Sequence, residues 1–112
     1  MSGFGTTAFA ERWGRFSLME QLGNIGSEVD RAIAWKRKGN DKLADAAFDR
    51  SLELMDLSIS DSRWRGGTLK ELTRVREVLC DTFLGDNSYN TPPESLSKYF
   101  YAFAVAAQRK KS

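Results

Sequence analysis

Acidic side chains at helical spacing are the first groups in this sequence whose types and positions could do chemistry. Two carboxylates held close together can act as a general acid and base, or can bind Mg²⁺. Asp56 and Asp81 are of most interest because they lie nearest to apolar stripes. Most other acids fall on the polar side of amphipathic stretches, where exposed charge is the rule: Glu28, Asp30, Asp45, Asp49 and Glu53.

Histidine is absent from all 112 residues. This excludes Ser-His-Asp and Cys-His nucleophile systems, zinc sites with histidine ligands and the Glu-x-x-His pairs of di-iron helical bundles. No other catalytic or metal-ligating constellation stands out. We therefore predict that the protein is not an enzyme, that it has no catalytic or metal-binding residues, and that it uses no cofactor.

One segment imitates the start of a calcium-binding loop. Asp86, Ser88 and Asn90 copy the spacing of the first three ligands, but Thr91 replaces the required glycine and Ser97 stands where the last acidic ligand should be. We expect these side chains to build turns by hydrogen bonding to the nearby backbone.

The single cysteine, Cys80, permits no disulfide within the chain and favours a reducing compartment. Its place in an amphipathic stretch is typical of a small core residue. The first seven residues lack the features of a secretory signal, and no apolar stretch reaches the roughly 18 residues needed to cross a bilayer. We expect a cytoplasmic protein that does not contact membranes.

A basic loop and the helix after it form a candidate nucleic-acid surface. An exposed tryptophan between two arginines can stack on a base or anchor a protein partner. The competing interpretation is that the tryptophan packs back onto the bundle while the arginines pair with nearby acids. The net charge of +2 favours no nucleic acid by itself. The candidate residues are Arg63, Trp64, Arg65, Lys70, Arg74 and Arg76.

Aromatic residues near both ends of the chain exceed what one helical layer can bury, because consecutive side chains on a helix point about 100° apart. Trp13, Phe16, Tyr99 and Tyr101 are therefore a candidate interaction surface. Either the N-terminal segment packs over the last helix, or a second copy covers these side chains. We favour a homodimer, the commonest symmetric assembly.

Four amphipathic stretches must position these groups. The first is expected from 17 to 38, where Ser17 and Glu20 form a capping-box signature and Gly39 ends the helix. The second, at about 41–59, follows a very short turn, so the pair forms an antiparallel helical hairpin. The third is expected from 68 to 84, with Thr68 and Glu71 as a second capping box.

The fourth stretch begins at 91–94, where threonine, two prolines and glutamate give a strong helix start. Aromatics from Phe9 to Phe16 suggest either a short extra helix or a packed arm, and no run alternates as a strand would. The prediction is an all-α, antiparallel four-helix bundle in a single domain, with residues 1–8 as a flexible arm. Predicted core residues are Leu22, Ile25, Val29, Phe48, Leu52, Leu72, Leu79, Phe100 and Phe103.

Three stretches resemble short bacterial four-helix proteins of uncharacterised function: 24–29, 47–54 and 99–103. Some of these small bundles are similar to the HEPN superfamily of nucleotide-binding and RNA-cleaving proteins. Active members of that superfamily carry an arginine followed within a few residues by a histidine. This chain has no histidine, so the resemblance implies a fold and supplies no active site.

These patterns together favour a non-enzymatic helical interaction or accessory protein that self-associates, with a different protein as a further candidate partner. The alternative is a nucleic-acid-binding bundle that uses the basic surface between Arg63 and Arg76.

Overall fold

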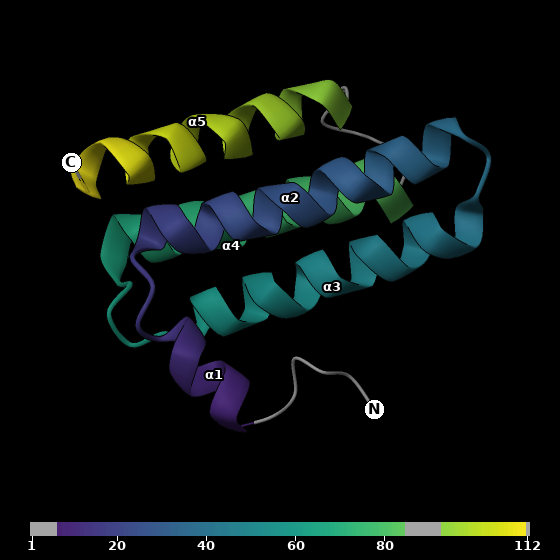
Figure 1. Cartoon of the computed structure of the whole chain (residues 1–112). Coiled ribbons are helices and arrows are strands. Elements are labelled where there is room, and N and C mark those ends of the chain that lie inside the picture. Colours follow the sequence, from purple (N-terminus) through teal and green to yellow (C-terminus); the bar gives the residue numbers. More distant parts are fainter. Residues whose placement is uncertain (1–6, 85–92, 112) are drawn as a thin grey trace.

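The structure is a computed structural model that describes residues 7–84 and 93–111, and within them it is built of helices joined by short connections (Figure 1). No strand occurs among these residues, so the predicted all-α class is confirmed. No described helix combines the length and apolar character needed to cross a membrane. The helices are α1 (Thr7–Trp13), α2 (Leu18–Arg37), α3 (Asp41–Ile59), α4 (Gly66–Leu84) and α5 (Pro93–Lys111).

Local hydrogen bonds define the hairpin of α2 and α3. The predicted capping box of α2 is formed: Ser17 Oγ accepts from the Glu20 amide at 3.1 Å, and Glu20 Oε1 accepts from the Ser17 amide at 3.0 Å. Gly39, with φ of +78°, lets the chain leave α2 in the left-handed conformation. Asn40 then caps α3 by accepting from the Leu43 amide at 3.0 Å.

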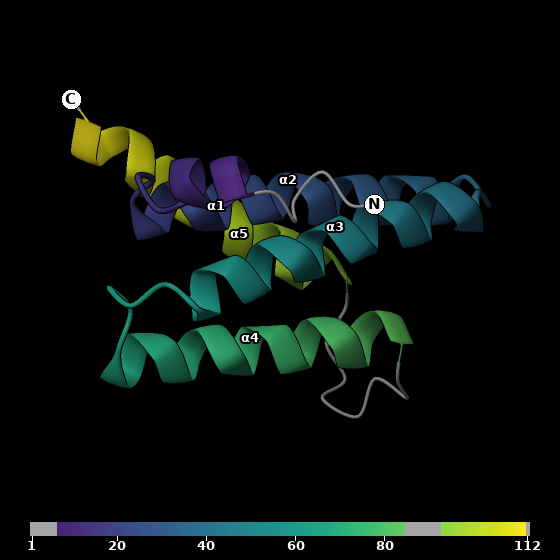
Figure 2. The ribbon, with the colours of Figure 1, turned by 90° about the horizontal axis from the view of Figure 1, so that it is seen from below.

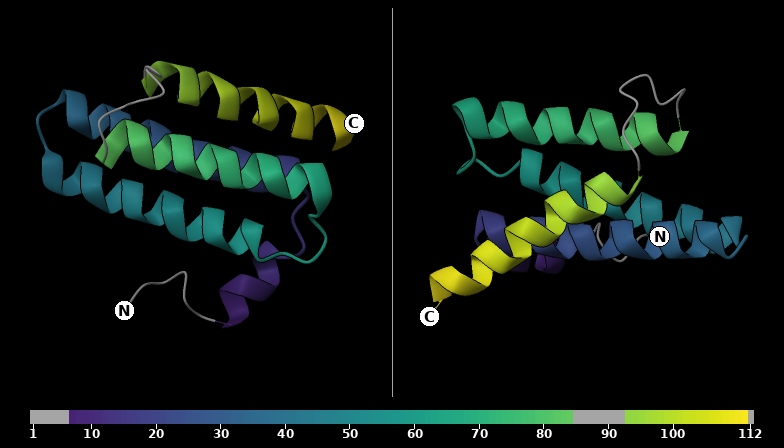
Figure 3. Two further views of the ribbon diagram at one scale, coloured as in Figure 1. Left: turned by 180° about the vertical axis from the view of Figure 1, so that it is seen from behind. Right: turned by 90° about the horizontal axis from the view of Figure 1, so that it is seen from above.

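The helix α2 is the centre of the bundle. It packs extensively against α3 on one side and α5 on the other, and α4 makes its main contact with α3. Figure 2 shows α4 in a layer of its own, along one side of the molecule, while Figure 3 shows α5 inclined across α2. Successive long helices run in opposite directions, as predicted. The helices α4 and α5 are thus attached to different members of the hairpin.

The contact between α2 and α5 depends on a glycine. Gly26 is buried, and a Cβ atom built there would overlap the Cβ of Phe100, which is itself 1% exposed. Absence of a side chain at this position lets the α5 backbone approach α2 closely.

The predicted core is largely confirmed. The buried members are Leu22, Ile25, Val29, Phe48, Leu72, Leu79 and Phe100. Leu52 is only partly buried at the edge of this cluster, and the side chain of Phe103 lies outside the described part of the chain. The core also includes Trp13, which the sequence analysis assigned to a surface, and Met55; these side chains are 3% and 0% exposed.

Two predicted boundaries are wrong. α4 begins at Gly66, two residues before the predicted start, so the capping box of Thr68 and Glu71 is not formed. α1 is a true helix that already includes Thr7 and Ala8, so the predicted flexible arm of residues 1–8 is too long. The remainder of that arm and the loop with calcium-like spacing, 86–90, lie outside the described residues.

The close approach at Gly26 gives a stability prediction. Gly26→Ala should lower the free energy of unfolding by about 1–2 kcal/mol, because the cost of overpacking exceeds the gain in helix propensity. Gly67→Ala is the matched control, since no atom lies within 4 Å of a Cβ at that helical position. Urea denaturation of both variants checks the prediction, and equal stabilities would contradict it.

Candidate functional site

A buried carboxamide organises the end of the bundle where the basic loop begins. Gln21 of α2 is 0% exposed. Its Oε1 accepts from Ser58 Oγ at 2.8 Å and from Trp64 Nε1 at 3.0 Å. Its Nε2 donates to the Trp13 carbonyl at 2.9 Å and to Asp61 Oδ2 at 3.3 Å. Every hydrogen-bonding position of this amide is therefore used.

Arg63 extends the same network. It donates to both carboxylate oxygens of Asp61, at 2.7 and 3.0 Å, and to the Phe16 carbonyl at 2.7 Å. Its guanidinium carbon also lies 4.5 Å from the centroid of the Trp64 ring. The hydrogen bonds from Arg63 are the main reason why the pKa of Asp61, a side chain only 10% exposed, falls to about 2.

The loop that was a candidate for base stacking is therefore anchored to the bundle. Trp64 is half-buried and hydrogen-bonded, and Arg63 is paired, as in the competing interpretation made from the sequence. Arg76 is likewise paired, with its Nε 2.7 Å from Asp56 Oδ1. Arg65 is exposed and donates to the Ser62 carbonyl.

Lys70 and Arg74 differ from these arginines. Both are exposed on α4, and neither forms an ion pair within the described part of the chain. Lys70 and Arg74 are therefore the two helical residues of the predicted basic surface whose positive charges are not paired with an acidic side chain among the described residues.

The predicted aromatic surface is not assembled as one patch. Trp13 is a core residue, 3% exposed, and its Nε1 donates to Ser58 Oγ at 3.1 Å; its assignment to a surface was therefore wrong. Phe16 packs edge-on against Trp13, with ring centroids 5.7 Å apart. Both lie at the α1 end of the molecule, whereas Tyr99 and Tyr101 belong to α5, across α2 from α1 (Figure 1). Helix α1, the described part of the N-terminal segment, does not pack over the last helix.

The two tyrosines of α5 also point in different directions. They are two positions apart, which corresponds to about 200° around a helix. Tyr99 turns toward α4, and Tyr101 is 70% exposed.

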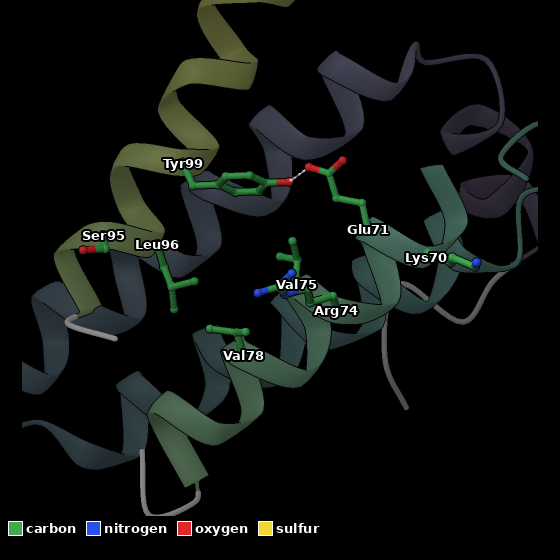
Figure 4. A pocket seen from close by; sticks show the side chains of 8 residues that line it. All are labelled: Lys70, Glu71, Arg74, Val75, Val78, Ser95, Leu96 and Tyr99. Atoms are coloured by element: carbon green, nitrogen blue, oxygen red, sulfur yellow. Dashed lines mark hydrogen bonds between the residues drawn. The ribbon is translucent and has the colours of Figure 1, made fainter. Parts of the chain in front are cut away.

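A cavity of about 560 Å³ lies between α4 and α5. Figure 4 shows Val75 and Val78 on one wall, with Leu96 and the Tyr99 ring on the other. The guanidinium of Arg74 reaches into the space between the two helices, whereas Lys70 points away from α5 (Figure 4). We call this cavity the α4–α5 groove. Lys70, Glu71 and Ser95 complete its lining.

A hydrogen bond between Tyr99 and Glu71 spans the groove. Tyr99 donates its hydroxyl to Glu71 Oε1 at 2.7 Å. Burial, and then the hydrogen bond to Glu71, raise the pKa of Tyr99 well above its ordinary value, because both disfavour the phenolate. Glu71 thus links α4 to α5, where the sequence suggested a cap for α4.

A second cavity, of about 530 Å³, lies beside α1 and is lined in part by Phe9, Phe16 and Arg12. At its base is Glu28, which is 5% exposed and is neutralised by Arg31 and Arg50. The lining of this second cavity holds two arginines, Arg12 and Arg31, and one carboxylate, Glu28, so its net charge is positive.

Of the two carboxylates singled out from the sequence, Asp56 pairs with Arg76 and Asp81 is half-buried on α4. No group of three or more His, Cys, Asp or Glu side chains is placed to hold a metal ion among the residues that the structure describes. Cys80 is partly buried on α4, with its sulfur 3.8 Å from Arg76 Nη1.

Comparison of the chain with known protein families, with curated proteins and with solved structures finds no match. The resemblance to HEPN proteins therefore stays a prediction, and the site must be interpreted from its own geometry.

The amide network predicts the effect of removing Gln21. Gln21→Leu should lower the free energy of unfolding by about 3 kcal/mol or more, because it leaves buried donors and acceptors unpaired. Asn24→Ala is the control, since the exposed Asn24 side chain donates to the Glu20 carbonyl in its own helix and bonds no other helix among the described residues. Its effect should stay within about 0.5 kcal/mol. Similar losses in both variants, measured in urea, would refute a special role for Gln21.

Asp61 predicts a pH dependence. Its lowered pKa means that the carboxylate stabilises the fold fully above its ordinary pKa of 3.8, and that this stabilisation is lost as pH falls toward 2. The difference in unfolding free energy between wild type and Asp61→Asn should therefore shrink between about pH 5 and pH 2. Urea titrations across this range measure it, and a difference that is independent of pH would count against the interaction.

Proposed function

We propose that this chain is a non-enzymatic helical interaction protein that self-associates through the side of α4 that borders the α4–α5 groove. The observation that carries the proposal is the α4–α5 groove, where two helices of one bundle leave apolar side chains incompletely covered. Val75 and Val78 are only partly buried, although they stand on the side of α4 that faces α5. An apolar groove between helices is a common docking site for another helix.

The polar groups of the groove suit binding better than proton transfer. The Tyr99 hydroxyl, with its raised pKa, is held by Glu71, and both groups therefore serve to join the helices. Arg74 contributes a permanent charge that can orient an acidic partner. This division between apolar walls and a few charges at the edge is typical of protein interfaces.

The alternative proposal is nucleic-acid binding by the basic surface. Lys70, Arg74 and Arg65 support it, because all three are exposed cations. Arg63 and Arg76 weaken it, because their charges are already matched by Asp61 and Asp56. We therefore rank self-association first.

Sedimentation equilibrium tests the proposal. The wild type should dimerise at micromolar concentration, and Val78→Asp should weaken the dimer at least about tenfold, since a carboxylate would be buried at an apolar contact. Tyr101→Ala is the control, because Tyr101 is exposed on the far side of α5 from Tyr99. Thermal melts establish that both variants fold.

A wild type that stays monomeric at several hundred micromolar contradicts self-association. A dimer that is lost on Tyr101→Ala but kept on Val78→Asp would place the interface on the aromatic surface predicted from the sequence. The alternative function would be favoured if a monomeric wild type binds single-stranded RNA in a salt-sensitive manner. This binding should then disappear in the variants Lys70→Ala and Arg74→Ala.

A further inference from the structure

The α4–α5 groove contains a cation that is directed into it and is not neutralised. Arg74 of α4 has no ion pair or hydrogen bond among the residues that the structure describes. Its guanidinium reaches into the space between α4 and α5 (Figure 4). Arginine stays protonated throughout the pH range in which proteins fold, so the groove holds a permanent positive charge where a ligand would lie.

The other charged residues of the lining do not cancel this charge. Glu71 is turned toward α5, where its Oε1 accepts the Tyr99 hydroxyl at 2.7 Å (Figure 4). Glu71 and Arg74 are three positions apart in one helix, a spacing at which ion pairs form, but these two side chains do not pair. Lys70 points away from α5 (Figure 4). Among the residues that line the groove, Arg74 alone offers an uncompensated charge to its interior.

The walls around this charge are apolar. Val75 and Val78 stand on α4, and Leu96 and the ring of Tyr99 face them from α5 (Figure 4). The volume of about 560 Å³ falls in the range of small-molecule sites, which combine apolar walls with a few polar groups that fix the orientation of the ligand. An alkyl chain placed along these walls would leave water, and the hydrophobic effect would stabilise the complex.

We infer that the α4–α5 groove binds a small amphipathic carboxylate, with its alkyl chain along the apolar walls and its head group on Arg74. A guanidinium donates two parallel hydrogen bonds to a carboxylate, which makes this pair both strong and directional. An acidic helix from another protein suits the groove less well. Such a helix presents acids in a row, whereas one cation is directed into the groove.

This inference goes beyond the proposed self-association, because a monomer can bind the ligand without a second copy. It also has a consequence for self-association. A ligand in the groove covers Val75 and Val78, the side chains that a second copy would cover. The two binding events therefore oppose each other, and the carboxylate should shift a dimer toward monomers.

Binding of octanoate to the wild-type protein tests the inference. Octanoate should bind saturably, with a dissociation constant of about 1 mM or below. Octanol and octyltrimethylammonium carry the same chain on a neutral and a positive head group. Both should bind at least about tenfold more weakly, because neither can accept two hydrogen bonds from a guanidinium. Shifts of the backbone amide signals in NMR titrations provide the measurement.

Three variants locate the carboxylate. Arg74→Gln removes the charge and should weaken octanoate binding about tenfold while leaving octanol binding unchanged, which also shows that the groove is intact. Arg65→Gln is the matched control, since Arg65 is exposed but does not line the groove, and it should bind octanoate as the wild type does. Glu71→Gln keeps an acceptor for Tyr99 and removes a repelling charge, so it should bind octanoate at least as tightly as the wild type.

The possible outcomes separate this inference from the proposed function. It is overturned if octanoate does not saturate, if octanol binds equally well, or if Arg74→Gln keeps the wild-type affinity. An equal loss in Arg65→Gln would indicate attraction by overall charge and would also overturn it. So would a groove that takes an acidic helical peptide and no octanoate. A wild type that binds octanoate but stays monomeric supports the inference and contradicts self-association.

Discussion

The burial of the Gln21 carboxamide is the constraint on which the rest of the structure depends. An uncharged amide in an apolar interior is costly unless its donors and acceptors are all satisfied. Here the partners come from α1, α3 and the segment before α4. The hydrogen bonds that satisfy this one side chain therefore fix the positions of three segments relative to α2. The same bonds satisfy the indole nitrogen of Trp64 and, through Ser58, that of Trp13. Large aromatic rings can therefore fill this end of the bundle.

This constraint explains how the α4–α5 groove arises. The loop that carries Trp64 and Arg63 is fixed to α2, so α4 must start beside the end of α3 and follow it. Phe83 packs on Phe48, with ring centroids 5.2 Å apart, and keeps the other end of α4 against α3. α5 is instead drawn onto α2 by the contact of Phe100 with Gly26. Two helices attached to different members of a hairpin diverge, and the groove is the space between them.

Local patterns predicted the elements well, because their causes are local. The capping box at Ser17 and the turn at Gly39 involve residues within a few positions of each other. The start of α4 was misplaced because Gly66 and Gly67 have the composition of a loop, although the first helical turn includes both. The position of Gln21 one residue before Leu22 gave no signal of burial, because its partners Ser58 and Trp64 lie 37 and 43 residues away.

The candidate site was predicted less well for the same reason. The basic loop was recognised, but which of its charges are compensated depends on Asp56 and Asp61, whose positions follow from the packing of α3. Trp13 was assigned to a surface because the sequence gives no sign of its burial. Ser58, which accepts the hydrogen bond from its indole nitrogen, is 45 residues away. The α4–α5 groove is a product of tertiary arrangement alone. The charged residues of its α4 wall, Lys70, Glu71 and Arg74, in contrast, belong to one helix, and their spacing can be seen in the sequence.

Two indoles are linked to one amide, that of Trp64 directly and that of Trp13 through Ser58, and this has a spectroscopic consequence. Trp13 and Trp64 are both connected to Gln21, whereas Trp35 lies at the opposite end of the hairpin, with Lys38 Nζ 5.1 Å from its ring centroid. The intrinsic fluorescence of the chain therefore contains two signals of different origin. Emission from Trp13 and Trp64 reports the closing of contacts across more than forty residues of sequence, because both rings change surroundings together. Emission from Trp35 reports only the turn between two neighbouring helices.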